Sequence, residues 1–309
     1  MKKKRINLKE NNQLLLLALP GLIWFIVFSY LPLIGNVIAF KDFKIHKGGF
    51  LNSLIQSDWV GLDNFEFLFS SSDTLLMLRN TIGYNLLFIV LGTAIPIIIA
   101  ISINELRNKR AAKVYQSIMF FPYFLSWVVV SYFLFAFLDP SKGLINAIRE
   151  AFGYESINFY LEPKYWPYFL VALNIWKGLG YGTVLYLASI VGIDKTYYEA
   201  AMLDGATKMQ QIRYITLPFL KPVVTILVIL SVSKILNSDF GLFYQVPRNS
   251  GALYSVTQTV DTFVYRAMTS LGDIGMSSAA ALFQSTVGCV LVLLSNWLIT
   301  KIDKENAIF

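Results

Sequence analysis

The residues with the most telling spacing form one polar stretch, EAAMLDGATKMQQIRYITLP (199–218), which interrupts a strongly apolar sequence. Its first half carries carboxylates, small residues and a glycine: Glu199, Ala200, Ala201, Asp204 and Gly205. We expect residues 196–207 to be helical, because a carboxylate near a helix start is stabilised by the helix dipole and glycine readily ends a helix. Small side chains let another protein approach closely, so the chemistry of this stretch is docking.

The second half of the stretch predicts a further helical piece over 208–214, with Lys208 and Arg213 among polar glutamines. Leu217 and Pro218 then begin the next apolar segment, where proline is tolerated in the first helical turn. A simple connector between two apolar segments would also suit small residues and a glycine. Residue types alone leave both the connector and the docking interpretation open.

Polar and aromatic side chains inside the apolar segments form a second group of candidates. Such groups are costly in a membrane and usually face a bundle interior or a water-filled cavity. They are Asn85, Ser126, Trp127, Tyr132, Asn174, Trp176, Lys177, Tyr181, Asn237, Asp239 and Gln284. Ser126 with Trp127, and Asn174 with Trp176, are the best candidates for a solute path. The alternatives are hydrogen bonds between helices and, for tryptophan, anchoring at the membrane interface.

Several kinds of chemistry find no support in this chain. One histidine, His46, and one cysteine, Cys289, exclude a multi-histidine metal site and a disulfide framework. No G-x-x-x-x-G-K-[ST] phosphate loop occurs, and the GLGYG run at 178–182 lacks the lysine that such a loop needs. We therefore predict no catalytic residues, and any energy from ATP must come from another protein.

The elements that position these residues are membrane-spanning helices. The chain has 309 residues, of which 56% are hydrophobic and 15% charged, against about a quarter charged in soluble domains. Its apolar blocks reach the roughly 20 residues that cross a bilayer. We predict an all-α polytopic membrane protein with six spans: 14–40, 80–103, 114–137, 166–191, 218–236 and 277–300.

Lysine and arginine set the orientation of these spans. Fourteen of them lie in the N-terminus, the loops 104–113 and 192–217, and the C-terminus, against nine in the three longer loops. The positive-inside rule then places both termini and the docking stretch in the cytoplasm. The net charge of +7 thus reflects a lipid bilayer as partner, not nucleic acid.

The outer loops are less informative. Loop 41–79 alternates apolar and polar residues around WVGLDNFEFLF, which favours an interfacial segment. Loop 238–276 could touch a binding protein, dip toward a pore or be a solvated connector. Its candidate residues are Phe243, Tyr244, Arg248, Tyr254 and Arg266.

The spacing of Glu199, Ala200, Ala201, Gly205 and Leu217-Pro218 resembles the EAA loop of the membrane subunits of ATP-binding-cassette (ABC) importers. The resemblance extends through LALPGLIWFIVFSYLPLIGNVIAFKDF (17–43), VGLDNFEFLF (60–69) and residues 78–130. These segments are similar to binding-protein-dependent sugar-importer permeases with the type I, MetI-like fold. FPYFLSWVVV (121–130) is most similar to the branch for complex oligosaccharides, such as fragments of pectin or alginate.

The resemblance implies three regions: an N-terminal tail, first helix and outer loop over 1–79, a five-helix core over 80–300 with the coupling loop 192–217, and a cytoplasmic tail over 301–309. It implies that Glu199, Ala200, Ala201, Asp204 and Gly205 contact an ATPase. The expected partners are a second homologous permease, two cytoplasmic ATPases that bind ATP and Mg, and an extracellular solute-binding lipoprotein. The expected location is a bacterial cell membrane, and the expected solute is a carbohydrate.

Other functions stay open. A related importer could carry another small solute, such as a glycerol phosphate or a polyol. A membrane-embedded glycosyltransferase would need a carboxylate pair or a metal cluster, which the apolar segments do not offer. An ion-driven transporter would normally show inverted repeats and buried ionisable groups.

Overall fold

The structure is a computed structural model that describes residues 8–66 and 72–302. It divides into two compact units, Met1–Ser70 with Ala267–Leu282, and Ser71–Arg266 with Phe283–Phe309, which are described separately. The expected division of the chain at residues 79 and 300 stays a prediction. The terminal residues 1–7 and 303–309, and the end of the predicted interfacial segment at 67–69, lie outside the described residues.

The first unit begins with a long helical segment whose residues from Leu15 to Phe40 are predominantly apolar. Its elements are α1 (Leu8–Phe25), the π-helical η1 (Ile26–Tyr30), the 3-10 helix η2 (Leu31–Phe40), β1 (Lys41–Asp42), α2 (Phe50–Gln56), β2 (Asp58–Trp59) and η3 (Asp63–Phe65). A helix that is apolar all round suits a membrane environment.

A small polar cap follows this helical segment. The strands β1 and β2 pair antiparallel, with Lys41 opposite Trp59. The buried Lys41 ammonium donates to the carbonyl oxygens of Leu54 at 2.7 Å and Ser57 at 3.0 Å, which satisfies its charge inside the cap.

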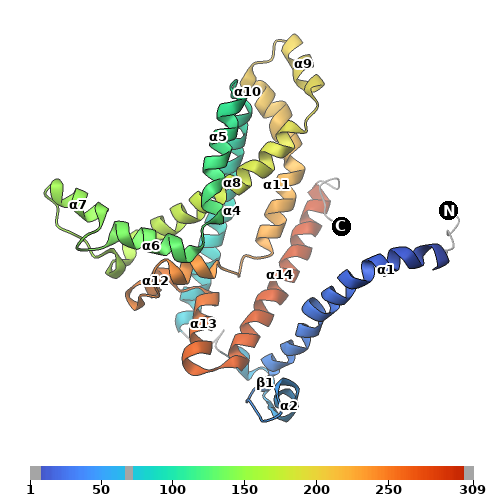
Figure 1. The fold of residues 1–309 in the computed structure, drawn as a ribbon, viewed down its shortest axis with the longest axis vertical. Helices are drawn as coiled ribbons and strands as arrows, with labels where there is room; N and C mark the ends of the chain where they lie inside the picture. Colours follow the sequence, from blue (N-terminus) through green and yellow to red (C-terminus); the bar gives the residue numbers. More distant parts are fainter. Residues whose placement is uncertain (1–7, 67–71, 303–309) are drawn as a thin grey trace. The chain divides into compact units, whose positions relative to one another are not determined.

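The second unit holds the remaining elements, apart from the residues that α13 and α14 contribute to the first (Figure 1). They are α4 (Ser72–Asn104), α5 (Lys109–Phe120), η4 (Phe121–Phe124), α6 (Trp127–Leu138), α7 (Leu144–Ala151), η5 (Phe159–Leu161), η6 (Pro163–Tyr165), α8 (Trp166–Val191), α9 (Lys195–Leu203), α10 (Lys208–Gln211), η7 (Ile212–Thr216), α11 (Leu217–Val232), η8 (Gly241–Gln245), η9 (Gly251–Leu253), α12 (Tyr254–Thr257), α13 (Val260–Leu271) and α14 (Ile274–Ile302). Helix α4 packs along α8, and α11 packs against both.

Each predicted span is mainly helical. By length and hydropathy, four helices of the described residues can cross a membrane, and a fifth if a bent pair counts as one. The four are Leu15–Phe40, Asp73–Asn104, Lys208–Val232 and Ile274–Lys301. Helix α8, the fourth predicted span, has 26 residues, includes Asn174 and Lys177, and is not among these four. The predicted all-α permease fold is confirmed by the structural comparisons given below.

The third predicted span, 114–137, is not one straight helix. The segments Lys109–Phe124 and Trp127–Leu138 meet at 98°. The residue after η4, Leu125, is extended, and the Ser126 hydroxyl accepts the Val129 amide to begin α6 afresh. Pro122, at the start of η4, has no amide hydrogen to continue the ladder of α5. The sequence analysis missed this break.

The loop over 238–276 is largely packed within its unit and is not a solvated connector. Leu242, Phe243, Val246 and Leu253 are buried together with Tyr84, Trp166 and Leu170 from the long helices α4 and α8. The loop therefore contributes part of the hydrophobic core of the second unit. Of its candidate residues, Phe243 belongs to this core and Arg248 is exposed.

Candidate docking helix and solute cavity

The docking stretch forms α9, which starts one residue earlier than predicted and ends four residues sooner. Its N-cap is Asp194, whose Oδ1 accepts the Thr196 amide at 2.9 Å. Hydrogen bonds from the backbone and the side chain of Thr196 lower the pKa of the Asp194 carboxyl. Asp194 therefore supplies the carboxylate at the positive helix end, a role that the sequence analysis gave to Glu199.

Gly205 ends α9, so the expected helix over 196–207 is too long. Its φ is 79°, a left-handed conformation that glycine adopts without strain. The Gly205 amide donates to the Met202 carbonyl at 3.1 Å and the Ala206 amide to the Ala201 carbonyl at 2.8 Å. This pair of bonds is a Schellman motif. Thr207 then caps α10 through a capping box with Gln210.

Helix α9 is braced against the start of α11, and α10 is paired with the residue that follows α4. The hydroxyls of Tyr198 and Thr216 are 3.0 Å apart, and the rings of Tyr197 and Phe219 are 5.1 Å apart, which ties α9 to the start of α11. Lys208 forms an ion pair of 3.1 Å with Glu105, just after α4. A displacement of α9 would therefore reach α11, and a displacement of α10 would reach the end of α4.

The outer surface of α9 is open to a partner. Glu199, Ala200, Asp204 and Gly205 are exposed, and Ala201 is half-buried. Leu203, which was not predicted, has 90% of its surface exposed. Its position between Met202 and Asp204 in an otherwise polar stretch was the signal that could have identified it.

A solute-sized cavity lies beside the bend between η4 and α6. Its volume is about 500 Å³, and it is lined by Tyr123, Leu125, Ser126, Trp127, Asn174, Lys177, Gly178 and Asp239. Five candidate residues of the sequence analysis, Ser126, Trp127, Asn174, Lys177 and Asp239, thus meet here although they come from three separate segments. Tyr123 was not predicted; Pro122 beside it could have indicated the break that exposes it.

Lys177 is the cation of this cavity. Its ammonium donates to the carbonyl oxygens of Tyr123 at 2.8 Å and Leu125 at 2.7 Å. It also lies over the rings of Tyr123 and Trp127, at 5.7 and 5.4 Å from their centroids. The bend frees backbone carbonyls, and Lys177 satisfies two of them while leaving one of its three N–H groups for a further acceptor.

Asp239 holds the opposite wall in place. Its Oδ1 accepts the Gly241 amide at 3.0 Å, and its Oδ2 accepts the Trp127 indole N–H at 2.6 Å. A side chain on Gly241 would overlap Trp127, so the indole packs closely against the backbone there. The Trp127 ring is therefore a fixed aromatic surface beside Lys177.

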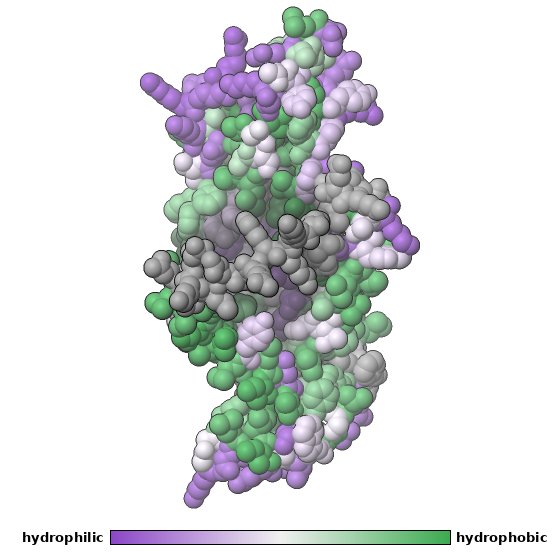
Figure 2. Space-filling model, turned by 90° about the vertical axis from the view of Figure 1, so that its right-hand side faces the viewer, coloured by the Kyte–Doolittle hydropathy of each residue, from purple (hydrophilic) through white to green (hydrophobic). Residues whose placement is uncertain are grey.

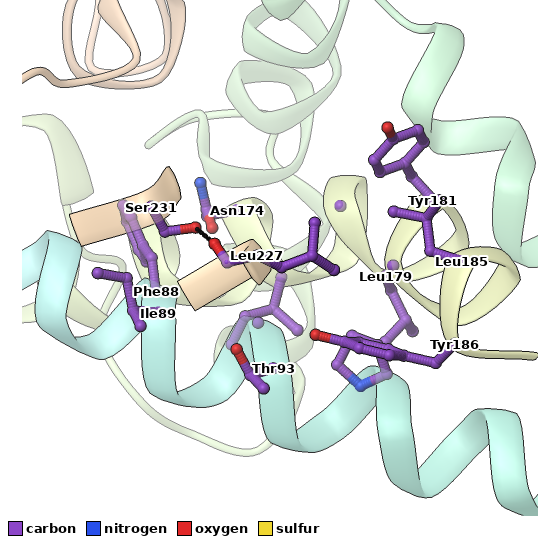
Figure 3. Close-up of a pocket in the computed structure, with 15 residues that line it drawn as sticks. Phe88, Ile89, Thr93, Asn174, Leu179, Tyr181, Leu185, Tyr186, Leu227 and Ser231 are labelled. Atoms are coloured by element: carbon purple, nitrogen blue, oxygen red, sulfur yellow. Dashed lines mark hydrogen bonds between the residues drawn. The ribbon is translucent and has the colours of Figure 1, made fainter. Parts of the chain in front are cut away.

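A second cavity of about 220 Å³ shares Asn174 and Gly178 with the first. Figure 3 shows the hydroxyls of Thr93 and Tyr186 directed toward each other and Tyr181 apart from Ser231 and Leu227. The Tyr181 ring stacks on Tyr123 at 5.1 Å. Tyr181, predicted for the path, thus connects the two cavities.

The other predicted path residues lie outside the larger cavity. Asn85 donates to the Ile235 and Asn237 carbonyls, at 2.8 Å each, and Gln284 donates to the Leu236 carbonyl at 2.7 Å. These bonds hold the segment after α11 in place. They agree with the alternative interpretation, in which such polar side chains form hydrogen bonds between helices. The roles of Asn85, Trp176, Asn237 and Gln284 in a solute path stay predictions.

Residues 92–304 match the family described as "Binding-protein-dependent transport system inner membrane component". This match spans more than half of the chain. The chain belongs to this family. The predicted resemblance is therefore confirmed, and the permease is an integral membrane component.

Curated relatives of the permease extend over nearly its whole length. The polygalacturonan/rhamnogalacturonan transport system permease protein YteP of Bacillus subtilis is 36% identical over 307 residues, which cover 99% of this chain and 94% of YteP. Protein LplB of the same organism is 34% identical over 299 residues, 97% of this chain and 92% of LplB.

Solved structures show the same fold. A chain of a bacterial ABC transporter involved in the import of the acidic polysaccharide alginate has a TM-score of 0.85 and 31% identity, covering 96% of this chain and 98% of that one. The alginate transporter in complex with an alginate pentasaccharide-bound periplasmic protein gives 0.85 and 30%, covering 97% and 99%.

Proposed function

We propose that this permease is the membrane-spanning subunit of an ATP-driven ABC importer for an oligosaccharide that an extracellular solute-binding protein delivers. It pairs with a second homologous permease in a bacterial cell membrane. Two cytoplasmic ATPases bind ATP and Mg and drive the transport. The observation that carries the proposal is α9, a capped helix with an exposed outer surface that is tied to the start of α11.

The mechanism follows from these ties. An ATPase that binds Glu199 and packs on Ala200, Ala201 and Leu203 moves α9 when its nucleotide state changes. Tyr197 and Tyr198 pass that movement to the start of α11, and α10, which follows α9, is paired through Lys208 with Glu105 after α4. The long helices then alternate between inward-open and outward-open arrangements, a rigid-body transition between two states.

Substitution of Gly205 tests the coupling. We expect Gly205→Trp to insert into the membrane and to hydrolyse ATP in the complex while uptake falls at least tenfold. The bulky side chain would occupy the docking surface and strain a left-handed residue. Gly205→Asn is the matched control, because asparagine tolerates this conformation better. Normal uptake by Gly205→Trp, or failure of any ATPase to co-purify with the wild type, would refute the docking role.

The solute side of the proposal rests on the cavity at the bend. Its volume suits a small ligand, the rings of Tyr123 and Trp127 can pack on the C–H faces of a sugar, and Asn174 offers hydrogen bonds. Lys177 has a free N–H for a carboxylate. An oligosaccharide that contains uronic acids therefore fits better than a neutral sugar, in keeping with the acidic polymers named for its relatives.

ATPase stimulation in reconstituted complexes tests the solute class. The rate of ATP hydrolysis by the complex that contains this permease is measured with four kinds of solute. Binding proteins loaded with uronate oligosaccharides, neutral oligosaccharides, a glycerol phosphate or a polyol are added in turn. We expect the uronate oligosaccharides to stimulate hydrolysis at least fivefold more than the others. Stimulation by the glycerol phosphate or the polyol alone would favour the alternative importer function.

A further inference from the structure

A separate cavity lies beneath α9, on the side away from its exposed docking surface. Its volume is about 520 Å³, and it is bordered by the loop after α4, the end of α8, α9 and α10. The end of the second unit that carries α9 and α10 is also where hydrophilic surface gathers (Figures 1 and 2). The docking role does not account for this cavity.

Positive charge dominates the polar lining. The cavity is lined by four cations, Arg107, Lys109, Lys195 and Lys208, and by one carboxylate, Glu105. Glu105 already pairs with Lys208. Within residues 8–66 and 72–302, the other three cations form no ion pair. The cavity thus keeps an excess of unneutralised positive charge.

Two of these cations sit at fixed positions. Lys109 is the first residue of α5, whose N-cap Asn108 accepts the amides of Arg110 and Ala111 at 3.0 and 3.2 Å. Lys195 is the first residue of α9, which Asp194 caps. Both helices therefore begin beside the cavity. The N-terminal end of α5 adds to the positive potential, whereas the Asp194 carboxylate offsets that of α9.

The uncharged lining combines the polar Asn104, Tyr198 and Gln211 with apolar residues. Ile190 and Ile193 are buried there, and Val191, the last residue of α8, has 70% of its surface exposed. The cavity thus joins a basic wall to the end of a long apolar helix. A ligand that fills it needs a negative head and can extend an apolar part along α8.

We propose that this cavity binds a phosphate-bearing anion, the headgroup of an anionic phospholipid in the leaflet next to α9. Basic pockets between membrane helices hold such headgroups. A free phosphate offers the same negative charge without the apolar part. Acidic side chains of a partner ATPase could also meet the cations, but they would leave Val191 uncovered, so the lining favours the lipid.

Lipid binding to the purified complex with its ATPases, in neutral detergent, tests this site. The probe is fluorescent phosphatidylglycerol, compared with phosphatidylcholine and with competition by inorganic phosphate. We expect Arg107→Gln and Lys195→Gln each to weaken phosphatidylglycerol binding about fivefold, since each basic residue near such a surface contributes about that factor. Lys113→Gln, which removes an exposed α5 cation outside the cavity, is the matched control and should leave binding unchanged.

The outcomes separate the sources of the anion. Phosphatidylglycerol binding that resists millimolar phosphate identifies the lipid headgroup, and displacement by phosphate identifies the free anion. Equal weakening by Lys113→Gln, or no weakening by the two cavity variants, would overturn the proposal. The proposal would also be overturned if the two cavity variants lost the ATPase subunits but kept phosphatidylglycerol binding. The assay measures no transport, so its failure is distinct from failure of the importer function.

Discussion

At the scale of single residues, Lys177 donates hydrogen bonds to two backbone carbonyls and lies over two aromatic rings. Its position in the sequence could not reveal these contacts. A lysine within an apolar segment indicates a cavity or a pair, and that much was predictable. Its acceptors, the carbonyls of Tyr123 and Leu125, arise only because the third predicted span breaks between η4 and α6. The candidate path was thus predictable by residue type, and its contacts were not.

Replacing Lys177 should loosen the bend. We expect Lys177→Met to lower stability by about 1–3 kcal/mol, because it leaves two carbonyls without a donor. The apparent Tm of the purified permease measures the loss. Lys164→Met is the control, since the Lys164–Glu162 pair is exposed and 3.8 Å long, and it should change stability by less than about 0.5 kcal/mol. Equal melting temperatures for both variants would contradict the assigned role.

Asp194 gives α9 a pH dependence. The pKa of this carboxyl is lower in the folded protein than in the unfolded chain because Thr196 donates to it. Its cap therefore stabilises α9 above the unfolded pKa of about 4, and the benefit is lost as pH falls through the lower, folded value. The protection of the α9 amides, measured as hydrogen exchange relative to the intrinsic rate at each pH, should fall in that acidic range.

Asp194→Asn provides the comparison for this pH dependence. Asparagine caps a helix about as well as aspartate but does not titrate, so the acid-induced change in exchange should shrink. An identical change in Asp194→Asn and wild type would show that another group controls α9.

At the scale of elements, local sequence signals predicted which helices exist better than they predicted where each helix begins and ends. The end of α9 at Leu203 depends on the left-handed Gly205, and the sequence analysis named that glycine but placed the helix end four residues late. The break before α6 depends on Pro122 and Ser126, which a hydropathy pattern reads as part of one apolar run. The packing of residues 242–253 against α4 and α8 had no local signal, because those partners are distant in sequence.

That packing predicts a large effect for a loop residue. We expect Phe243→Ala to destabilise the protein by about 3–5 kcal/mol, since the ring is buried against Tyr84 and Phe88 and its removal leaves a cavity. Thermal unfolding in detergent measures it, with the exposed Leu161→Ala as control. A loss below about 1 kcal/mol would mean that the loop does not belong to the core.

At the scale of the whole molecule, composition alone predicted that the protein lies in a lipid bilayer and that its fold is all-α. Long apolar blocks identify a bilayer protein before any motif is considered, and the fold of the solved alginate transporter chains agrees. The orientation rests on lysine and arginine counts and stays a prediction.

Accessibility labelling tests that orientation. In a Cys289→Ser background, an impermeant maleimide should label Phe152→Cys in intact cells and Met209→Cys only after permeabilisation. Both side chains are well exposed, at 77% and 71%. The reverse pattern would place the docking stretch outside the cell.

One glycine contact has a consequence for sequence variation. A Cβ on Gly180 would overlap the backbone of Met119 and Phe120, so α8 and the end of α5 meet there without any intervening side chain. By contrast, a Cβ on Gly178, in the same helix, would meet no atom within 4 Å. A scan of all substitutions should therefore find residue 180 almost invariant and residue 178 permissive to alanine, and related permeases that lack glycine at 180 must separate these helices.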